Sequence, residues 1–156
     1  MATQFSHIQD GKARMVDISN KGTVERSATT SGRIVLRCET IARIVDGSVE
    51  KGNVLATARI AAIMAAKKTP DIIPMCHQIQ VTSCDVEFEI SEQYITSTVT
   101  VKSVGSTGVE MEALHAVCVS LLTIWDMVKS VEKDETGNYP DTVIENIRVI
   151  EKIKRG

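Results

Sequence analysis

The chain has 156 residues, a net charge of −2 at pH 7 and a pI near 5.9. Its length suits one domain that buries its own core, and 43% hydrophobic and 24% charged residues are ordinary for a soluble globular protein. The slight acidic excess argues against bulk affinity for nucleic acid, which requires a basic surface, so an anionic ligand would need a local basic cluster.

The cysteine content indicates a reducing compartment. The four cysteines, Cys38, Cys76, Cys84 and Cys118, include no C-x-x-C pair, and the chain opens without a signal peptide. No apolar run reaches the roughly 18 residues of a membrane span. We therefore expect a cytoplasmic protein with reduced thiols.

The first predicted elements follow a polar N-terminal arm. Residues 1–22 are weakly patterned and are expected to be loosely ordered, with an apolar segment at 15–18 suited to docking on the body. The pattern of residues 24–38 predicts a strand, and residues 39–45 predict a short helix that ends before Gly47.

A second helix and a second strand are predicted next. Asn53 is a good N-cap for an alanine-rich helix over 54–68, which Pro70 is expected to end. A loop over 71–77 then leads to a strand over 79–90.

The apolar phase of this strand shifts between Val81 and Cys84, which predicts a bulge. After a turn, the Thr/Val-rich residues 94–103 predict the partner strand of a hairpin. Residues 109–131 read as a long helix, and residues 142–153 as a last strand.

This order of elements predicts the α+β class. It matches a ferredoxin-like βαββαβ arrangement with one extra helix, in which an antiparallel sheet has its helices packed on one face. Residues 23–156 are predicted to be a single catalytic domain. The other face of the sheet is expected to be apolar and in need of a partner, which favours an oligomer.

Two candidate positions for chemistry lie before the long helix. Lys51 follows a glycine turn and suits either a solvated surface lysine or a group that binds phosphate or donates a proton. Cys76 and His77 lie in an apolar loop, where zinc would need further ligands. Neighbouring side chains in an extended loop point apart, which disfavours a Cys–His nucleophile pair. An acid–base role, or a hydrogen bond to an anion, suits His77 better.

The long helix carries acidic groups at both ends. Glu110 and Glu112 lie in its first turn, where the free N–H groups and the dipole favour anions. Asp126 and Lys129 are spaced i, i+3 and share a face, either as a surface ion pair or as an acid–base pair. Glu112 and Asp126 are 14 residues apart, about 21 Å along the helix axis. A compact ligand that touches both would therefore require two subunits.

Five segments together resemble one known family. They are Lys-Gly-Asn-Val at 51–54, Ala-Thr-Ala-Arg-Ile-Ala at 56–61, Ile-Pro-Met-Cys-His at 73–77, Gly-Ser-Thr-Gly-Val-Glu-Met-Glu-Ala-Leu at 105–114 and Leu-Thr-Ile-Trp-Asp-Met-Val-Lys at 122–129. In order and spacing they closely resemble the cyclic pyranopterin monophosphate synthase family, over about residues 15–134. The chain departs from the family at Gln78, Ser106, His115 and Trp125, and it lacks the family's frequent Gly-Gly-Lys-Ser-Gly tail.

The resemblance implies a lyase of molybdenum cofactor biosynthesis. Such an enzyme converts (8S)-3′,8-cyclo-7,8-dihydroguanosine 5′-triphosphate to cyclic pyranopterin monophosphate and diphosphate, by general acid–base catalysis at a subunit interface. It also implies a ferredoxin-like fold and a homohexamer built as a trimer of dimers. It implies no cofactor, metal site, nucleic-acid partner or membrane partner, and Mg²⁺ is expected only as the ion that a triphosphate carries.

The resemblance also assigns roles to residues. It implies that Asp126, Lys51 and Lys129 are catalytic. The residues implied to bind substrate are Met75, Cys76, His77, Glu110, Met111 and Glu112. Further basic residues that are candidates for meeting the triphosphate are Arg59, Lys67, Lys68 and Lys133.

The alternative is a non-catalytic, oligomeric ferredoxin-like module that binds or senses a nucleotide. It explains the fold, the charge and the oligomer. It does not explain an acid, two lysines and a histidine at the motif positions of an enzyme. We therefore expect an active enzyme.

Overall fold

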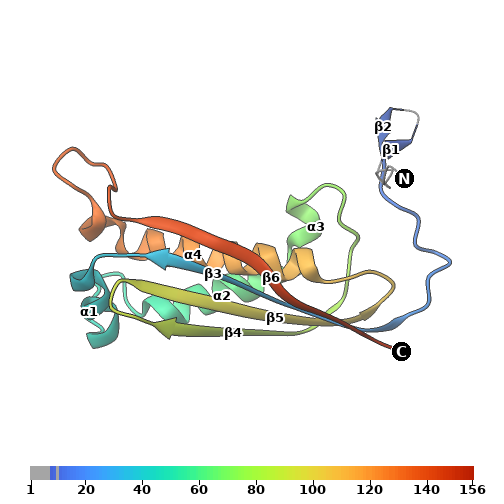
Figure 1. Ribbon diagram of the computed structural model, residues 1–156, viewed down its shortest axis with the longest axis horizontal. Coiled ribbons are helices and arrows are strands. Elements are labelled where there is room, and N and C mark those ends of the chain that lie inside the picture. Colours follow the sequence, from blue (N-terminus) through green and yellow to red (C-terminus); the bar gives the residue numbers. More distant parts are fainter. Residues whose placement is uncertain (1–7, 10) are drawn as a thin grey trace.

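A computed structural model of the chain describes residues 8–9 and 11–156, so residues 1–7 and 10 of the predicted arm lie outside the described residues (Figure 1). In chain order the elements are β1 (Ile8–Gln9), β2 (Lys12–Ala13), β3 (Val24–Val35), α1 (Cys38–Asp46), α2 (Val54–Lys67), α3 (Thr69–Ile72), β4 (Val81–Ile90), β5 (Tyr94–Gly105), α4 (Glu110–Glu132) and β6 (Val143–Arg155).

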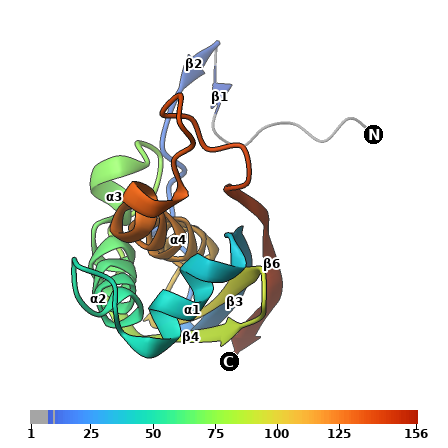
Figure 2. The ribbon, with the colours of Figure 1, turned by 90° about the vertical axis from the view of Figure 1, so that its left-hand side faces the viewer.

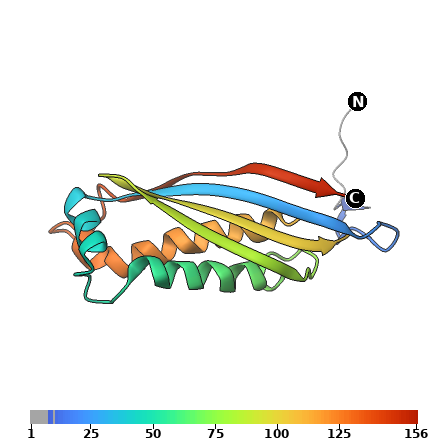
Figure 3. The same ribbon diagram turned by 90° about the horizontal axis from the view of Figure 1, so that it is seen from below.

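The main sheet has four strands in the order β4-β5-β3-β6, and each neighbouring pair is antiparallel. One crossover, through the helices α1 to α3, joins β3 to β4, and a second, through α4, joins β5 to β6. Figure 3 shows two layers, with α2 and α4 side by side on one face of the sheet. The predicted α+β, ferredoxin-like fold with an additional helix is therefore confirmed.

The core lies between the sheet and the two long helices. Inward-facing Ile34, Ile95 and Val99 are fully buried, as are Ala58 and Ala116 on α2 and α4. Alanine lets the two helix backbones approach closely, which is why an Ala-rich α2 packs along α4. The apolar length of α4 would suffice for a membrane span, but half of it is buried inside this fold, which accounts for its composition.

Several local predictions are confirmed. The Asn53 side chain accepts a hydrogen bond from Ala56 N–H and caps α2. Gly47 ends α1 with φ of 75°, a conformation in which glycine carries no penalty. The bulge in β4 appears as a register shift between Val81 and Ser83.

One helix boundary was predicted wrongly. Pro70 does not end α2, which stops at Lys67. Pro70 lies in the first turn of α3, where a backbone N–H would have no hydrogen-bond partner within the helix, so proline loses nothing by lacking one. Part of the loop predicted over 71–77 is therefore helical.

The open face of the sheet was also predicted wrongly, because it is polar. The alternation of β3 and β5 buries Ala28, Ile34, Ile95, Val99 and Val101, together with Thr30, Ser97 and Ser103, on the helix side. It places Thr29, Ser31, Thr96, Thr98 and Thr100 on the open face. Thr29 and Thr100 share a hydrogen bond of 2.9 Å across this face. The edge strand β4 adds the exposed acids Asp85, Glu87 and Glu89. Because the open face is polar, it gives no argument for an oligomer.

Candidate active site

The start of α4 forms one wall of a cavity of about 320 Å³, which we call the recognition pocket. All six residues predicted to bind substrate line it: Met75, Cys76, His77, Glu110, Met111 and Glu112. The apolar part of the arm contributes Val16 and Ile18. The structure therefore brings the Cys-His loop, the Glu-Met-Glu turn and the arm into one place.

Glu112 is the most unusual group in this pocket. Its side chain is buried, with 1% exposed, and neither carboxylate oxygen has a hydrogen-bond partner outside its own residue. Burial raises the pKa of Glu112, the charge of Glu110 raises it further, and its own backbone N–H opposes this only in part. A buried acceptor without donors is costly, so it suits a ligand that brings N–H groups.

Glu110 is held differently. One oxygen accepts a hydrogen bond from Lys152 Nζ at 2.6 Å, while the other has no partner. Burial alone would raise the pKa of Glu110, but the Lys152 hydrogen bond, with the charges of Lys152 and Arg26, outweighs it and lowers the pKa. A Cβ at Gly108 would lie 2.0 Å from this carboxylate, so the glycine gives Glu110 room to fold back.

The arm fixes the imidazole of His77. His77 Nε2 lies 2.6 Å from the carbonyl oxygen of Val16, and a nitrogen that faces a carbonyl must carry the proton. Nδ1 is then the remaining ring nitrogen for a substrate. The predicted docking of residues 15–18 is confirmed by this contact.

Cys76 is poorly suited to nucleophilic or metal chemistry. Burial, followed by the charges of Glu112 and Glu110, raises the pKa of its thiol. Nucleophiles and zinc ligands are thiolates. Among residues 8–9 and 11–156, no three His, Cys, Asp or Glu side chains group as metal ligands would.

The three residues predicted to be catalytic meet near the other end of α4, in what we call the acid–base cluster. Asp126 Oδ1 lies 2.7 Å from Lys129 Nζ, and Oδ2 lies 3.2 Å from Lys51 Nζ. Lys51 also donates a hydrogen bond to the carbonyl of Asp126 at 2.6 Å. One carboxylate is thus held between two ammonium groups. Lys51 is 75 residues from Asp126 in the sequence, and Lys129 is three residues along the same helix.

The contacts between Asp126 and the two lysines affect the protonation states of Asp126 and Lys129. Hydrogen bonds from Lys129 and then Lys51 lower the pKa of Asp126, and the Asp126 carboxylate raises the pKa of Lys129. At neutral pH the cluster therefore holds an ionised acid and a protonated Lys129. All three side chains are 43–59% exposed, so they are open to a ligand.

A buried carboxylate that sequence reasoning missed supports this end of α4. Glu132, 1% exposed, accepts hydrogen bonds from the hydroxyls of Thr40 and Thr142 and from Arg37 N–H. The Arg37 guanidinium also donates to the Val131 carbonyl. The start of α1, the end of α4 and the entry to β6 are thus tied together. Nothing in the sequence spacing indicates this clamp.

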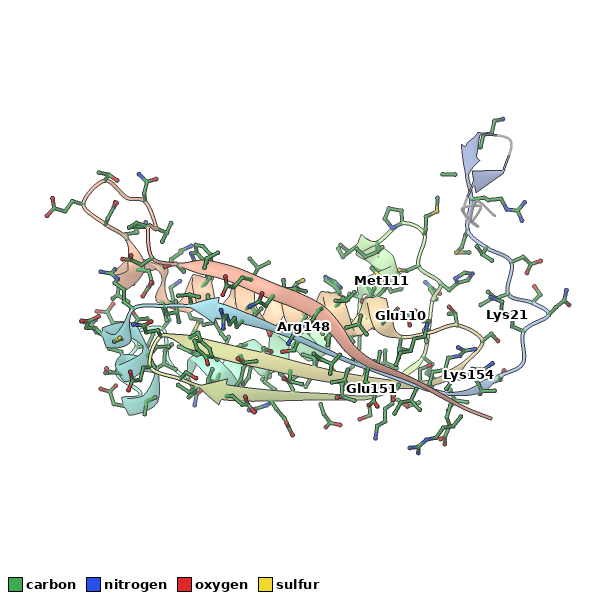
Figure 4. All side chains as sticks on the ribbon, in the orientation of Figure 1. Lys21, Glu110, Met111, Arg148, Glu151 and Lys154 are labelled. Carbon is green, nitrogen blue, oxygen red and sulfur yellow. The ribbon has the colours of Figure 1, made fainter. Side chains whose placement is uncertain are left out.

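A second missed feature is a basic cavity of about 450 Å³ beside the recognition pocket. Lys21, Arg26, Lys152 and Lys154 line it, together with Glu110. Figure 4 shows Lys21, Glu110 and Lys154 at the same end of the molecule. These cations come from the arm, β3 and β6, so no local motif could have revealed them.

One predicted phosphate contact is not available. Arg59 donates a hydrogen bond to the carbonyl of Val86, and its guanidinium carbon lies 5.5 Å from the centroid of the Phe88 ring. It therefore packs α2 on β4 and belongs to neither cluster.

The two clusters lie toward opposite ends of α4, about 21 Å apart along its axis (Figure 1). The structure therefore brings the predicted site residues together as two groups and not as one. This is the separation that the helix length predicts.

Comparisons with known proteins agree on one family. The sequence model of the MoaC family matches residues 15–155. A protein of Methanococcoides burtonii named "Probable cyclic pyranopterin monophosphate synthase" is 69% identical over 97% of this chain and 95% of its own length. Proteins of the same name from Archaeoglobus fulgidus and Pyrococcus abyssi are 59% and 56% identical, each over 97% or more of both chains.

Proposed function

Because the chain belongs to the MoaC family, we propose that it is a cyclic pyranopterin monophosphate synthase, the activity for which its relatives are named. It is a lyase of molybdenum cofactor biosynthesis. The substrate in this proposal is (8S)-3′,8-cyclo-7,8-dihydroguanosine 5′-triphosphate, and the products are cyclic pyranopterin monophosphate and diphosphate.

The observation that carries the choice of substrate is the pairing of an unpartnered carboxylate with a basic cavity. Glu112 offers two buried acceptor oxygens, which fit the N–H edge of a guanine-derived ring. The adjoining cavity is lined by Lys21 and Lys154, by Lys152, which is paired with Glu110, and by Arg26, which donates to the carbonyls of Gly105 and Ser106. Cations grouped in this way fit a polyphosphate. A guanosine-derived triphosphate carries both kinds of group on one molecule.

The acid–base cluster supplies the proton transfers. To close the cyclic phosphate, a substrate hydroxyl attacks the α-phosphorus, its proton passes to a base, and the bond to the β-phosphate oxygen breaks to release diphosphate. Asp126 is ionised and can accept a proton, while the Lys129 ammonium can donate one or neutralise charge that develops. Lys51 contacts the same carboxylate and is assigned the role of general acid.

Both clusters act on one substrate only if two subunits share a site. The surface between them on α4 and the neighbouring β6 carries exposed apolar side chains, among them Leu122, Ile147 and Ile150. In Figure 1, α4 and β6 run between α3 and the arm at one end and the loop after α4 at the other. We propose that a second copy covers it in an antiparallel sense, within a homohexamer built as a trimer of dimers.

The proposal assigns no cofactor to the protein, and Mg²⁺ enters with the triphosphate. The four cysteines are free, which suits the cytoplasm as the place of action. A non-catalytic nucleotide sensor would use the recognition pocket. It would have no use for the acid–base cluster.

The direct test is incubation with the cyclised triphosphate, followed by assay of diphosphate and pterin. The wild-type protein is expected to form both, and Lys51→Ala and Asp126→Asn are each expected to reduce turnover by about 10²- to 10⁴-fold, the range of general acid–base catalysis. Lys102→Ala, an exposed lysine on β5 outside both clusters, is the matched control. Near wild-type turnover in either cluster variant would contradict the assignment.

A further inference from the structure

The loop that joins α4 to β6 is organised around one side chain. Asp134 Oδ1 accepts hydrogen bonds from Thr136 N–H, from the Thr136 hydroxyl and from Asn138 N–H, at 2.7–2.9 Å. Asp134 and Asn138 are also joined through their backbones. Gly137 adopts φ of 85° at the tip. The loop therefore holds its own shape where it leaves the body of the molecule (Figures 1 and 2).

This loop delivers Tyr139 to the acid–base cluster. The Tyr139 ring packs edge-on against Trp125, with ring centroids 5.5 Å apart. Trp125 and Lys129 are one turn apart on α4 and share its face, so the ring of Tyr139 lies on the side of α4 that carries Lys129. Asp126 is the main cause that raises the pKa of Lys129, and Tyr139 adds to it weakly. The ring is half-buried, so packing fixes it while one edge stays open to a ligand.

The Tyr139 hydroxyl is free to bind a ligand. Within the described part of the chain, no hydrogen bond joins it to another group. A phenolic hydroxyl donates one hydrogen bond and accepts others, and a packed aromatic ring loses little conformational freedom on binding. A substrate group that binds beside the ammonium groups of Lys51 and Lys129 is expected to be anionic. An anionic group accepts a hydrogen bond from a phenolic hydroxyl.

We propose that Tyr139 is a further substrate-binding residue, whose hydroxyl donates a hydrogen bond to the anionic group of the substrate that meets Lys129. This inference rests on the proposed function, because it places the nucleotide-derived substrate at the acid–base cluster. It assigns a function to the loop after α4. The loop is the support that presents the tyrosine from outside the helix, and Trp125 is the surface on which the ring rests.

Tyr139→Phe tests the hydroxyl alone, since the ring and its packing on Trp125 are kept. The matched control is Tyr94→Phe, which removes a phenolic hydroxyl on β5, where Arg33 lies over the ring 4.8 Å from its centroid. Steady-state turnover gives KM and kcat for each variant. We expect Tyr139→Phe to raise KM by about 10- to 100-fold, the range for a hydrogen bond to a charged group, with an unchanged unfolding temperature. Tyr94→Phe is expected to match the wild type.

Trp125 provides a binding assay that needs no catalysis, because it is the single tryptophan of the chain. Its fluorescence is followed during titration with the cyclised triphosphate and, separately, with inorganic diphosphate. The midpoint is expected to move to higher ligand concentration in Tyr139→Phe, by the same factor as KM. If KM and the midpoint of Tyr139→Phe both stay within twofold of the wild type, the proposal is wrong.

The two proposals can fail separately. A wild-type protein that turns over normally, with an unaffected Tyr139→Phe variant, overturns the role of Tyr139 and leaves the enzyme assignment intact. A wild-type protein that binds the triphosphate without turnover overturns the proposed function. The fluorescence midpoints of Tyr139→Phe and Tyr94→Phe then still decide whether Tyr139 contacts the ligand.

Discussion

Glu112 is buried at the start of α4 with both carboxylate oxygens unpaired, an arrangement that opposes folding when no ligand is present. Most buried polar groups in folded proteins have partners. Here a ligand with N–H donors would complete the site. The same carboxylate therefore lowers the stability of the free protein and raises its affinity for the proposed substrate.

Glu112→Gln is expected to stabilise the ligand-free protein by about 1 kcal/mol or more at pH 8, because an amide carries no charge into the buried site. The folded-state pKa of Glu112 is raised by burial. Its destabilising effect is therefore full above that pKa and vanishes below the unfolded value of about 4.3. Urea unfolding at pH 8 and pH 5, at one protein concentration, measures the difference.

The advantage of Glu112→Gln should shrink toward pH 5, and turnover should fall at both pH values. Wild-type stability at or above that of the variant at pH 8 would show that Glu112 has a partner in solution. An equal advantage at both pH values would show that ionisation is not the cause.

At the scale of elements, periodicity was sufficient for the order of the main strands and helices along the chain, for α4 and even for the bulge in β4. These features depend on residues close in sequence, so a local pattern records them. Helix length alone also separated Glu112 from Asp126. Two incorrect expectations came from judging one residue without its neighbours. Pro70 fits the start of a helix as well as a stop, and Thr-rich strands put polar groups on the exposed face.

The contacts that complete each cluster were beyond the reach of a local pattern. Lys51 meets Asp126 because the loop between α1 and α2 closes onto the end of α4, and Glu132 secures that end through Arg37 and Thr40. The basic cavity likewise joins the arm to β6. Lys51 and Asp126 are 75 positions apart in the sequence, and Arg37 and Glu132 are 95 apart.

Gly32 illustrates how closely the elements approach. A Cβ at this position of β3 would lie 2.9 Å from side-chain carbons of both Ile147 and Leu121. The pairing of β3 with β6 shifts register beside it, between Ser31 and Arg33. A glycine here lets α4 and β6 converge on the centre of the sheet.

Gly32→Ala is therefore expected to destabilise the protein by about 1–3 kcal/mol, the usual cost of an added methyl group in a packed core. Gly22→Ala is the matched control, because a Cβ there meets nothing within 4 Å and its φ is not positive. Chemical unfolding of both variants measures the effect. Equal stabilities would mean that β6 and α4 yield to the added group at little cost.

At the scale of the whole molecule, one copy of the chain carries the recognition pocket and the acid–base cluster as two separate groups. The recognition pocket and the acid–base cluster are about 21 Å apart along α4, too far for one compact substrate. Exposed apolar side chains such as Leu122 and Ile150 lie on the elements between them. In the proposed assembly, an antiparallel second copy would bring each pocket to the cluster of its partner, so we expect activity to require assembly.

Mixed oligomers test this sharing of sites. Glu112→Ala chains lack a working recognition pocket and Asp126→Ala chains lack a working acid–base cluster, so each is expected to be inactive alone. In a random equal mixture, about one quarter of the shared sites combine an intact pocket from one chain with an intact cluster from the other. Co-expression with two different tags, followed by purification on both, isolates the mixed oligomers for turnover assays.

The control is a mixture of Lys51→Ala and Asp126→Ala chains. These two residues contact each other within one subunit, so every cluster in that mixture has a defect and no activity should return. Recovery in the first mixture but not in the second requires that a site draw its pocket and its cluster from different chains. If the first mixture assembles and remains inactive, each substrate is handled within one subunit, and α4 would have to bend or the substrate to move between the two clusters.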